Sequence, residues 1–439
     1  MANSYLSRTT GTATNADKFT FSAWVKRSNL GSNQTLIGQY TDGNNRSEFG
    51  FISNDKLRWE FVLSGSNVAT FETNRLFRDP NAWYHFVLAY DSTQSTSTDR
   101  FKLYVNGTQE TSFSSSNYPS QNADSRWQTS GLTLNIGQRG GNGQYFDGYM
   151  SHVAFVDGTA LTPTSFGETD STSGIWKFKG PPGITWGNNG FHLKFENSGA
   201  LGTDSSGNTN TFTVNGNLKQ TIDTPSIVYP TWNVLASPDG TLSNGNLSNT
   251  AAHDTPATFG VTTGKWYWEY KRTNSTNSLH YGICSTKKGF RLIQNQMLNG
   301  ESNSVGAAIY IFESGTGSTG YGNAGAFSSV NYGSVSTPSI ANGDIVGCAL
   351  DISSASGTLT FYKNGSSLGA ATFTYDQVTP VYPFIRMNGG ATTDVNFGTG
   401  LFGTTAIASA GSNGNGSLFE YDVPSNHYAL NTKNINTYG

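Results

Sequence analysis

Gly343–Gly369 reads GDIVGCALDISSASGTLTFYKNGSSLG, and apolar and polar residues alternate in it over Ile345–Ile352 and Thr358–Tyr362. This period of two residues is typical of half-buried strands. Asn364-Gly365 follows at once, and Asn-Gly favours the two positive φ angles of a tight hairpin turn. The pattern therefore predicts a strand, a short loop, a second strand, a turn and a return strand.

The same design occurs much earlier in the chain. Phe101–Val105 runs into Asn106-Gly107 and returns through Thr108–Thr111. Two hairpins of one design, far apart in the sequence, indicate two β domains of similar architecture. A length of 439 residues is enough for two or three domains, each with its own core.

The composition favours an all-β chain. Gly accounts for 52 residues, and aromatic and charged residues make up 13% each. A disordered chain would be poor in aromatics, and a helical chain would be rich in Glu, Lys, Leu and Ala. Short aromatic strands joined by polar turns fit this composition best.

Charge and hydropathy narrow the range of partners and compartments. The net charge is −3, without a long run of either sign, so no nucleic-acid partner is expected. No apolar run approaches the ~20 residues of a membrane-spanning helix, so no membrane insertion is expected either. The N-terminus lacks a basic segment followed by an apolar one, which predicts synthesis in the cytoplasm without a signal peptide. Cys284 and Cys348 lie in apolar strand-like runs, where two buried free thiols fit better than a disulfide.

Residues 1–168 contain many short strands and no long amphipathic helix, which predicts a sandwich of two sheets. Phe19–Val25 alternates strictly and ends in Lys26-Arg27, as in a strand with one face inward. Four runs stand out: FSAWV from Phe21 within this strand, WYHFV from Trp83, LYVNG from Leu103 and FDGYMSHV from Phe146. Together they resemble the laminin-G-like (concanavalin A-like, pentraxin-like) jelly roll.

Residues 229–403 carry a second set of runs in a fixed order. They are GKWYWE from Gly264, YGIC from Tyr281, GDIVGC from Gly343, FYKNG from Phe361, YPF from Tyr382 and NFG from Asn396. Together they are similar to the SPRY family. SPRY domains are also concanavalin A-like sandwiches, which would account for the two similar Asn-Gly hairpins. The pattern is loose from Phe290 to Ser339, where a Gly/Ser/Tyr-rich insertion lies.

Between these two parts, short alternating runs at Ile175–Phe178 and Phe191–Phe195 predict a small β connector. A Gly/Ser/Asn-rich segment opens the C-terminal tail. The expected fold is therefore all-β, with two concanavalin A-like antiparallel sandwiches, a small β connector and a short tail. The expected domains are residues 1–168, 169–228, 229–403 and 404–439.

No catalytic residues are expected. Glycoside hydrolases of this fold need two carboxylates about 5 Å apart, usually within Glu-x-Asp-x-x-Glu on one strand. The chain has no such triplet, and the nearest pattern, Glu420-Tyr-Asp422, lies outside both sandwiches. The six histidines are scattered, without a closely spaced pair that would bind zinc.

The resemblance to laminin-G-like and pentraxin-like domains makes calcium the candidate cofactor. Asp91, Asp99, Asp147 and Asp157 lie at strand ends of the first domain. Oxygen ligands from separate loops suit a hard cation. The alternative, that these are ordinary turn-forming aspartates, stays open.

Aromatic side chains that face solvent can stack on sugars. Tyr310, Tyr321 and Tyr332 in the long insertion are the candidate ligand-binding residues. Trp24, Trp83, Trp266 and Trp268 are expected to build the cores instead.

The order of jelly roll, connector, SPRY domain and tail resembles phage virion-surface proteins. The resemblance implies a non-enzymatic tail-fibre, tail-tip or capsid-fibre protein located on the virion. Its expected partners are other virion proteins and a host-surface glycan or receptor, and it would form a homo-oligomer, with a trimer favoured. The main alternative is a capsid-decorating or tail-assembly protein that acts only through protein–protein contacts. A third is a hydrolase that degrades polysaccharide.

Overall fold

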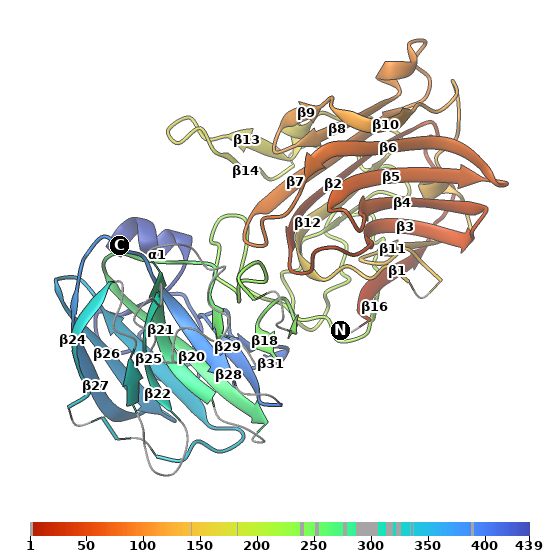
Figure 1. The fold of residues 1–439 in the computed structure, drawn as a ribbon. Helices are drawn as coiled ribbons and strands as arrows, with labels where there is room; N and C mark the ends of the chain where they lie inside the picture. Colours follow the sequence, from red (N-terminus) through yellow and green to blue (C-terminus); the bar gives the residue numbers. More distant parts are fainter. Residues whose placement is uncertain are drawn as a thin grey trace. The chain divides into compact units, whose positions relative to one another are not determined.

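The computed structural model describes most of the chain and divides it into two compact units. The first unit comprises residues 1–220 and 224–226, and the second comprises residues 221–223 and 227–439. Figure 1 shows the strands of each unit. The described residues are 3–141, 143–181, 183–237, 241–250, 254–274, 279–286, 306–312, 319–321, 326–333, 335–336, 338–387 and 390–439.

The first unit is a sandwich of two antiparallel sheets with a small hairpin outside them (Figure 1). In order of neighbouring strands, sheet 1 contains β10 (Phe113–Asn117), β6 (Ser66–Leu76), β5 (Lys56–Leu63), β4 (Asn45–Phe51), β3 (Gln34–Asp42), β11 (Thr133–Ile136), β1 (Tyr5–Thr9) and β16 (Thr213–Asn215). Sheet 2 contains β15 (Phe191–Leu193), β12 (Gly148–Asp157), β2 (Lys18–Arg27), β7 (Trp83–Asp91), β8 (Phe101–Val105) and β9 (Thr108–Glu110). The outer hairpin pairs β13 (Gly167–Thr169) with β14 (Trp176–Phe178).

The second unit repeats this two-sheet plan. Sheet 3 contains β17 (Leu242–Ser243), β18 (Ser248–Asn249), β29 (Thr392–Asn396), β20 (Lys265–Asn274), β25 (Ile345–Asp351), β26 (Ser356–Lys363), β27 (Ser366–Tyr375) and β24 (Phe327–Asn331). Sheet 4 contains β19 (Asp254–Pro256), β28 (Val381–Met387), β21 (Leu279–Thr286), β22 (Gly306–Phe312) and β23 (Thr319–Tyr321). A short pair joins β30 (Leu401–Phe402) to β31 (Thr405–Ala406).

Short helical pieces complete the described secondary structure. The 3₁₀ turns are η1 (Ser97–Asp99), η2 (Arg126–Gln128) and η3 (Pro163–Ser165), and the α-helix is α1 (Thr432–Tyr438). Among the described residues, no helix has the length and apolar character needed to cross a membrane. The predicted all-β class with antiparallel sandwiches is confirmed.

Both predicted Asn-Gly hairpins are confirmed. The φ angles are 48° and 80° at Asn364 and Gly365, and 48° and 81° at Asn106 and Gly107. Two successive positive φ angles are what a type I′ turn requires, and they match the twist of the flanking strands. The turns join β26 to β27 and β8 to β9, and so set the register of those strands.

An aromatic core fills the first unit between its sheets. Phe19 of β2 stacks on Tyr90 with ring centroids 5.0 Å apart, and Trp59 of β5 stacks on Phe101 at 4.6 Å. Trp24 and Trp83 are buried, as expected, but they do not belong to this core between the sheets. Successive residues of a strand face opposite sides, and Ala23 and Val25 occupy the core. Trp24 and Trp83 are therefore buried on the outer face of sheet 2.

In the second unit the expected core residues are in place. Trp266 and Trp268 of β20 are fully buried and belong to the core between sheets 3 and 4. Cys284 and Cys348 are buried free thiols, as predicted, and burial raises the pKa of both.

Strands from the predicted connector lie within the sandwich of the first unit. β15 pairs with β12 at the edge of sheet 2, and β16 pairs with β1 at the edge of sheet 1. The C-terminal segment lies against the second unit in the same way. Its strand β32 (Tyr428–Ala429) pairs in parallel with β20.

Candidate functional site

The four aspartates predicted to bind calcium lie at two opposite ends of sheet 2. Asp91 and Asp157 flank the start of β2, because Lys18 pairs with Asp91 and Phe19 with Asp157. Asp99 closes η1, just before the strand that pairs with β7. Asp147 precedes the other end of β12, about 30 Å from Asp157 at ~3.3 Å per residue. The structure therefore does not bring all four carboxylates together.

Protein donors occupy much of the acceptor capacity of these carboxylates. Asp157 is buried and accepts hydrogen bonds from the backbone N–H of Thr14 at 2.8 Å and of Asn189 at 2.9 Å. Asp91 accepts from Thr93 and Gln94 at 2.6 and 2.7 Å, and these bonds lower its pKa against the effect of burial. Among the described residues, no group of three or more His, Cys, Asp or Glu side chains is arranged to hold a metal ion. Calcium binding by the first unit stays a prediction.

The three tyrosines predicted to bind sugar fall in a part of the second unit that is described only in places. Tyr310 lies in β22 and Tyr321 in β23, and the backbones of these strands pair. The side chains of Tyr310 and Tyr321 lie outside the described part. Tyr332 is half-buried and packs against the core of the second unit.

A polar surface on sheet 1 is a stronger candidate. Phe49 and Phe51 of β4 and Trp59 of β5 belong to the core, so the alternate residues of these strands face outward. We call this surface the charged face; it comprises Tyr40, Arg46, Glu48, Arg58, Glu60 and Arg139. Glu48 and Glu60 are directly opposite each other on neighbouring strands, as are Tyr40 and Arg46.

Ion pairs hold the side chains of the charged face in place. Arg46 donates to the carboxylate of Glu60 through Nε at 3.0 Å and Nη2 at 2.7 Å. Arg58 lies 3.4 Å from Glu48 and 3.9 Å from Glu60, and so bridges the two carboxylates. Burial raises the pKa of Glu48, while Arg139 and Arg58 oppose the shift. The result is a fixed array of donors and acceptors that is still partly open to solvent.

An aromatic ring borders the charged face. The guanidinium of Arg139 lies 4.5 Å from the centroid of the Tyr40 ring, within the range of a cation–π contact. Gly140 and Gly141, both at positive φ, allow the loop after β11 to lie on this ring, since a Cβ on either would stand within 2.9 Å of Tyr40 atoms. The tyrosine as a whole is half-buried.

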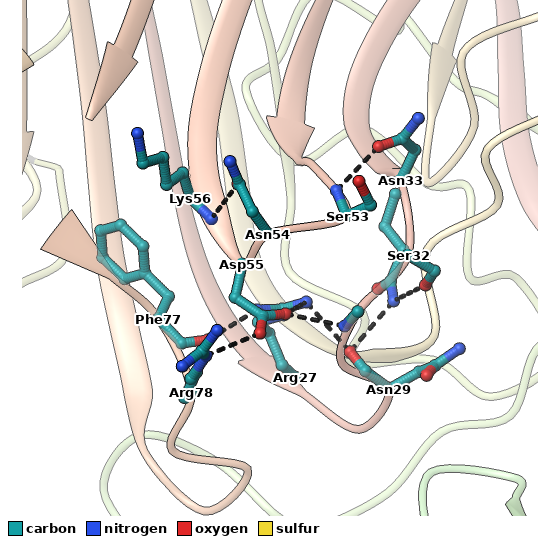
Figure 2. A network of polar contacts seen from close by, with 12 residues as sticks. Arg27, Asn29, Ser32, Asn33, Ser53, Asn54, Asp55, Lys56, Phe77 and Arg78 are labelled. Carbon is teal, nitrogen blue, oxygen red and sulfur yellow. Dashed lines mark hydrogen bonds and ion pairs between the residues drawn. The ribbon is translucent and has the colours of Figure 1, made fainter. Parts of the chain in front are cut away.

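A second polar network orders the loops at one end of the first unit (Figure 2). Arg27 at the end of β2 donates to the backbone oxygens of Phe77 at 2.6 Å and Asn29 at 3.1 Å. Asp55, in the turn between β4 and β5, accepts from Arg27 at 3.2 Å and from Arg78 at 2.8 Å. Arg27 is fully buried, so this network joins three loops to one another rather than presenting a charge to a ligand.

Sequence reasoning missed the charged face, although a signal was present. RSEFGF from Arg46 and RWEF from Arg58 both alternate Arg and Glu with aromatic or small residues. The alternation predicts charges on one face of each strand. It does not show that the two strands are neighbours with Glu48 opposite Glu60, because that depends on the register.

Comparison with known families assigns both units. Residues 1–165 match the Concanavalin A-like lectin/glucanases superfamily, and residues 265–400 match the SPRY domain family. The chain thus carries a laminin G-like domain followed by a SPRY domain, as its sequence motifs predict.

The chain is also similar to solved structures over a part or most of its length. Domains LG4-5 of the mouse laminin alpha1 chain share 9% identity, with 90% of this chain and 85% of that chain covered and a TM-score of 0.30. A heptameric SAP-like pentraxin from Limulus polyphemus shares 18%, with 36% and 71% covered and a TM-score of 0.27. The TRIM65 PSpry domain shares 15%, with 38% and 91% covered and a TM-score of 0.26. No curated protein sequence matches the chain.

Proposed function

We propose that this protein, a laminin G-like domain followed by a SPRY domain, is a non-enzymatic adhesion protein that binds carbohydrate through the charged face of sheet 1. The observation that carries the proposal is the array in which Arg46, Arg58, Glu48 and Glu60 are fixed by mutual ion pairs. Sugar hydroxyls both donate and accept hydrogen bonds, and charged partners strengthen such bonds. The Tyr40 ring at the border offers a surface for the apolar face of a sugar.

The setting we propose is the surface of a phage particle, where the protein would attach the virion to a host-cell glycan. The order of its domains resembles that of phage virion-surface proteins. Other virion proteins and further copies of this chain, as a trimer, would be its structural partners.

The two facing carboxylates of the charged face raise the question of hydrolysis. A retaining glycosidase uses one carboxylate as a nucleophile and the other as an acid. Glu60 is bound by two N–H groups of Arg46, which stabilise its charge and weaken it as a nucleophile. Binding without cleavage is therefore the function that we propose for this pair.

Binding of the purified full-length protein to host cells and to their isolated polysaccharide tests the proposal. We expect Arg58→Gln and Tyr40→Ala each to weaken binding about tenfold or more, without a large change in Tm. Lys102→Gln on sheet 2 removes the same charge from another exposed ion pair and is the matched control. Binding to virions but not to cells would favour the decorating protein, and release of reducing ends would favour a hydrolase.

A further inference from the structure

A hollow of about 430 Å³ lies outside sheet 2, at the base of the β13–β14 hairpin. Its walls come from residues 159–165 before the hairpin and from Lys179 and residues 183–185 after it. Both parts are anchored. Thr20 of β2 donates to the backbone oxygen of Thr159 and accepts from the N–H of Leu161, each at 2.7 Å. The backbone N–H of Lys179 donates to Phe166 at 3.1 Å.

The apolar part of the lining belongs to a small core of its own. Leu161 and Ile184 line the hollow and also pack against a buried cluster on the outer face of sheet 2. That cluster consists of Val87, Ala154, Val156 and Phe166. The hollow is thus supported by packed side chains, so it is formed before any ligand arrives.

The polar part of the lining carries one positive charge and several hydroxyls. Lys179 contributes the charge, and Thr159, Thr164, Ser165 and Thr185 contribute the hydroxyls. Among the described residues, no carboxylate lies within ion-pair distance of Lys179. The two acids of the hairpin, Glu168 and Asp170, lie 3.4 and 3.0 Å from Lys177 instead.

We propose that this hollow binds a sugar that carries a carboxylate, such as a uronic or sialic acid residue. The ammonium group of Lys179 would bind the carboxylate, and the threonine and serine hydroxyls would bind the sugar hydroxyls. Leu161 and Ile184 would contact the apolar face of the ring. The volume lies within the ~300–1,000 Å³ of small-molecule sites. This site lies on sheet 2 and is independent of the charged face of sheet 1.

Titration of the full-length protein with sodium glucuronate and with N-acetylneuraminate, followed by NMR or calorimetry, tests the site. We expect binding of at least one of these acids that weakens with added salt, and no binding of glucose at the same concentration. Lys179→Gln should weaken binding about tenfold or more. Lys177→Gln removes the same charge two residues earlier in the chain, outside the hollow, and should bind as the wild type does.

Three results would overturn the inference. The first is no binding of either acid, and the second is equal binding by the Lys179→Gln variant. The third is equal affinity for inorganic phosphate and the sugar acids, since this would mark a simple anion site. Arg58→Gln tests the charged face and should leave glucuronate binding unchanged. The experiments therefore distinguish an absence of sugar-acid binding in the hollow from an absence of glycan binding by the charged face.

Discussion

The guanidinium of Arg27 is fully buried, and Asp55 supplies its counter-charge at 3.2 Å. Burial lowers the pKa of Arg27, and the carboxylate of Asp55 opposes this shift. Asp55→Ala would leave a buried charge without its partner, so we expect the first unit to lose about 3–5 kcal/mol of stability. Calorimetry of the full-length protein would record the loss as a lower Tm.

An exposed ion pair provides the control for this substitution. Asp99 lies 3.0 Å from Lys102, and both side chains are partly open to solvent. Asp99→Ala should cost less than about 1 kcal/mol, because water screens such a pair. If Asp55→Ala and Asp99→Ala lowered the Tm equally, the network in Figure 2 would not stabilise the loops that it joins.

Glu269 of β20 is a buried acid that titrates near neutral pH. Burial raises its pKa to about 7, although hydrogen bonds from the backbone of Glu420 and Tyr421, each 2.9 Å long, oppose the shift. A carboxyl group whose pKa is higher in the folded state stabilises the fold below its unfolded pKa of 4.5, and this contribution is lost as the pH rises toward 7. We expect Glu269→Gln to remove this pH dependence, as measured by the Tm of the second unit.

Other groups of the second unit also titrate in this range, so the comparison with the wild type is essential. Burial raises the pKa of Asp254 to about 7, which acts in the same direction as Glu269. Burial lowers the pKa of His280 to about 4, which acts in the opposite direction. Asp254 and His280 remain in the Glu269→Gln variant, so their effects cancel in the difference between the Tm of the variant and that of the wild type. A difference in Tm that stays constant from pH 4.5 to 7 would contradict the assignment to Glu269.

Two aromatic side chains of β14 hold the β13–β14 hairpin on sheet 2: Trp176, and Phe178, which stacks on His152 of β12 with ring centroids 3.6 Å apart. Trp176 donates from Nε1 to Nδ1 of His85 at 2.9 Å, and His85 stacks on Trp24 with centroids 4.7 Å apart. Burial lowers the pKa of His85 to about 3, so the ring is neutral and Nδ1 accepts this bond. Gly107 and Gly167 lie against the indole, where a Cβ would stand within 2.5 Å of ring atoms.

Trp176→Ala should therefore loosen the hairpin, with the stacking of Phe178 on His152 as its remaining aromatic contact to sheet 2. We expect faster proteolysis and faster hydrogen exchange in residues 167–178, while sheets 1 and 2 keep their protection. Ile175→Ala alters an adjacent side chain that is 66% exposed, and should leave both measurements unchanged. Equal protection in the two variants would show that the β13–β14 pairing and the stacking of Phe178 on His152 hold the hairpin without Trp176.

Local sequence patterns were sufficient to predict the class of fold but not the long-range pairing of its strands. The Asn-Gly turns and the alternating strands are local, and both predicted hairpins are in place. The pairing of β15 with β12 and of β16 with β1 joins distant residues. The alternating run at Phe191–Phe195 predicted a strand there, but a local pattern does not name the partner of a strand. The charged face was missed for the same reason, since it depends on the register between β4 and β5.

The packing of the C-terminal segment on the second unit is also a long-range feature that local patterns did not predict, and a deletion can test its importance. Phe419, Val423, Ala429 and Leu430 are buried in the core of the second unit, and β32 extends sheet 3. Each large apolar side chain contributes about 1.5–3 kcal/mol through burial, against a net stability of about 5–15 kcal/mol for a domain. Deletion of residues 404–439 should therefore unfold the second unit and leave the first unit folded.

Calorimetry of the truncated chain would show the outcome as the loss of one transition. A shorter deletion of residues 436–439 is the control, because it removes only the end of α1 and the stacking of Tyr438 on Tyr428, whose ring centroids lie 3.7 Å apart. We expect this variant to keep both transitions with a small decrease in Tm. If the chain that lacks residues 404–439 also showed both unfolding transitions, the sandwich of the second unit would be stable without this segment. Glu269 would then tolerate the loss of the backbone N–H donors of Glu420 and Tyr421.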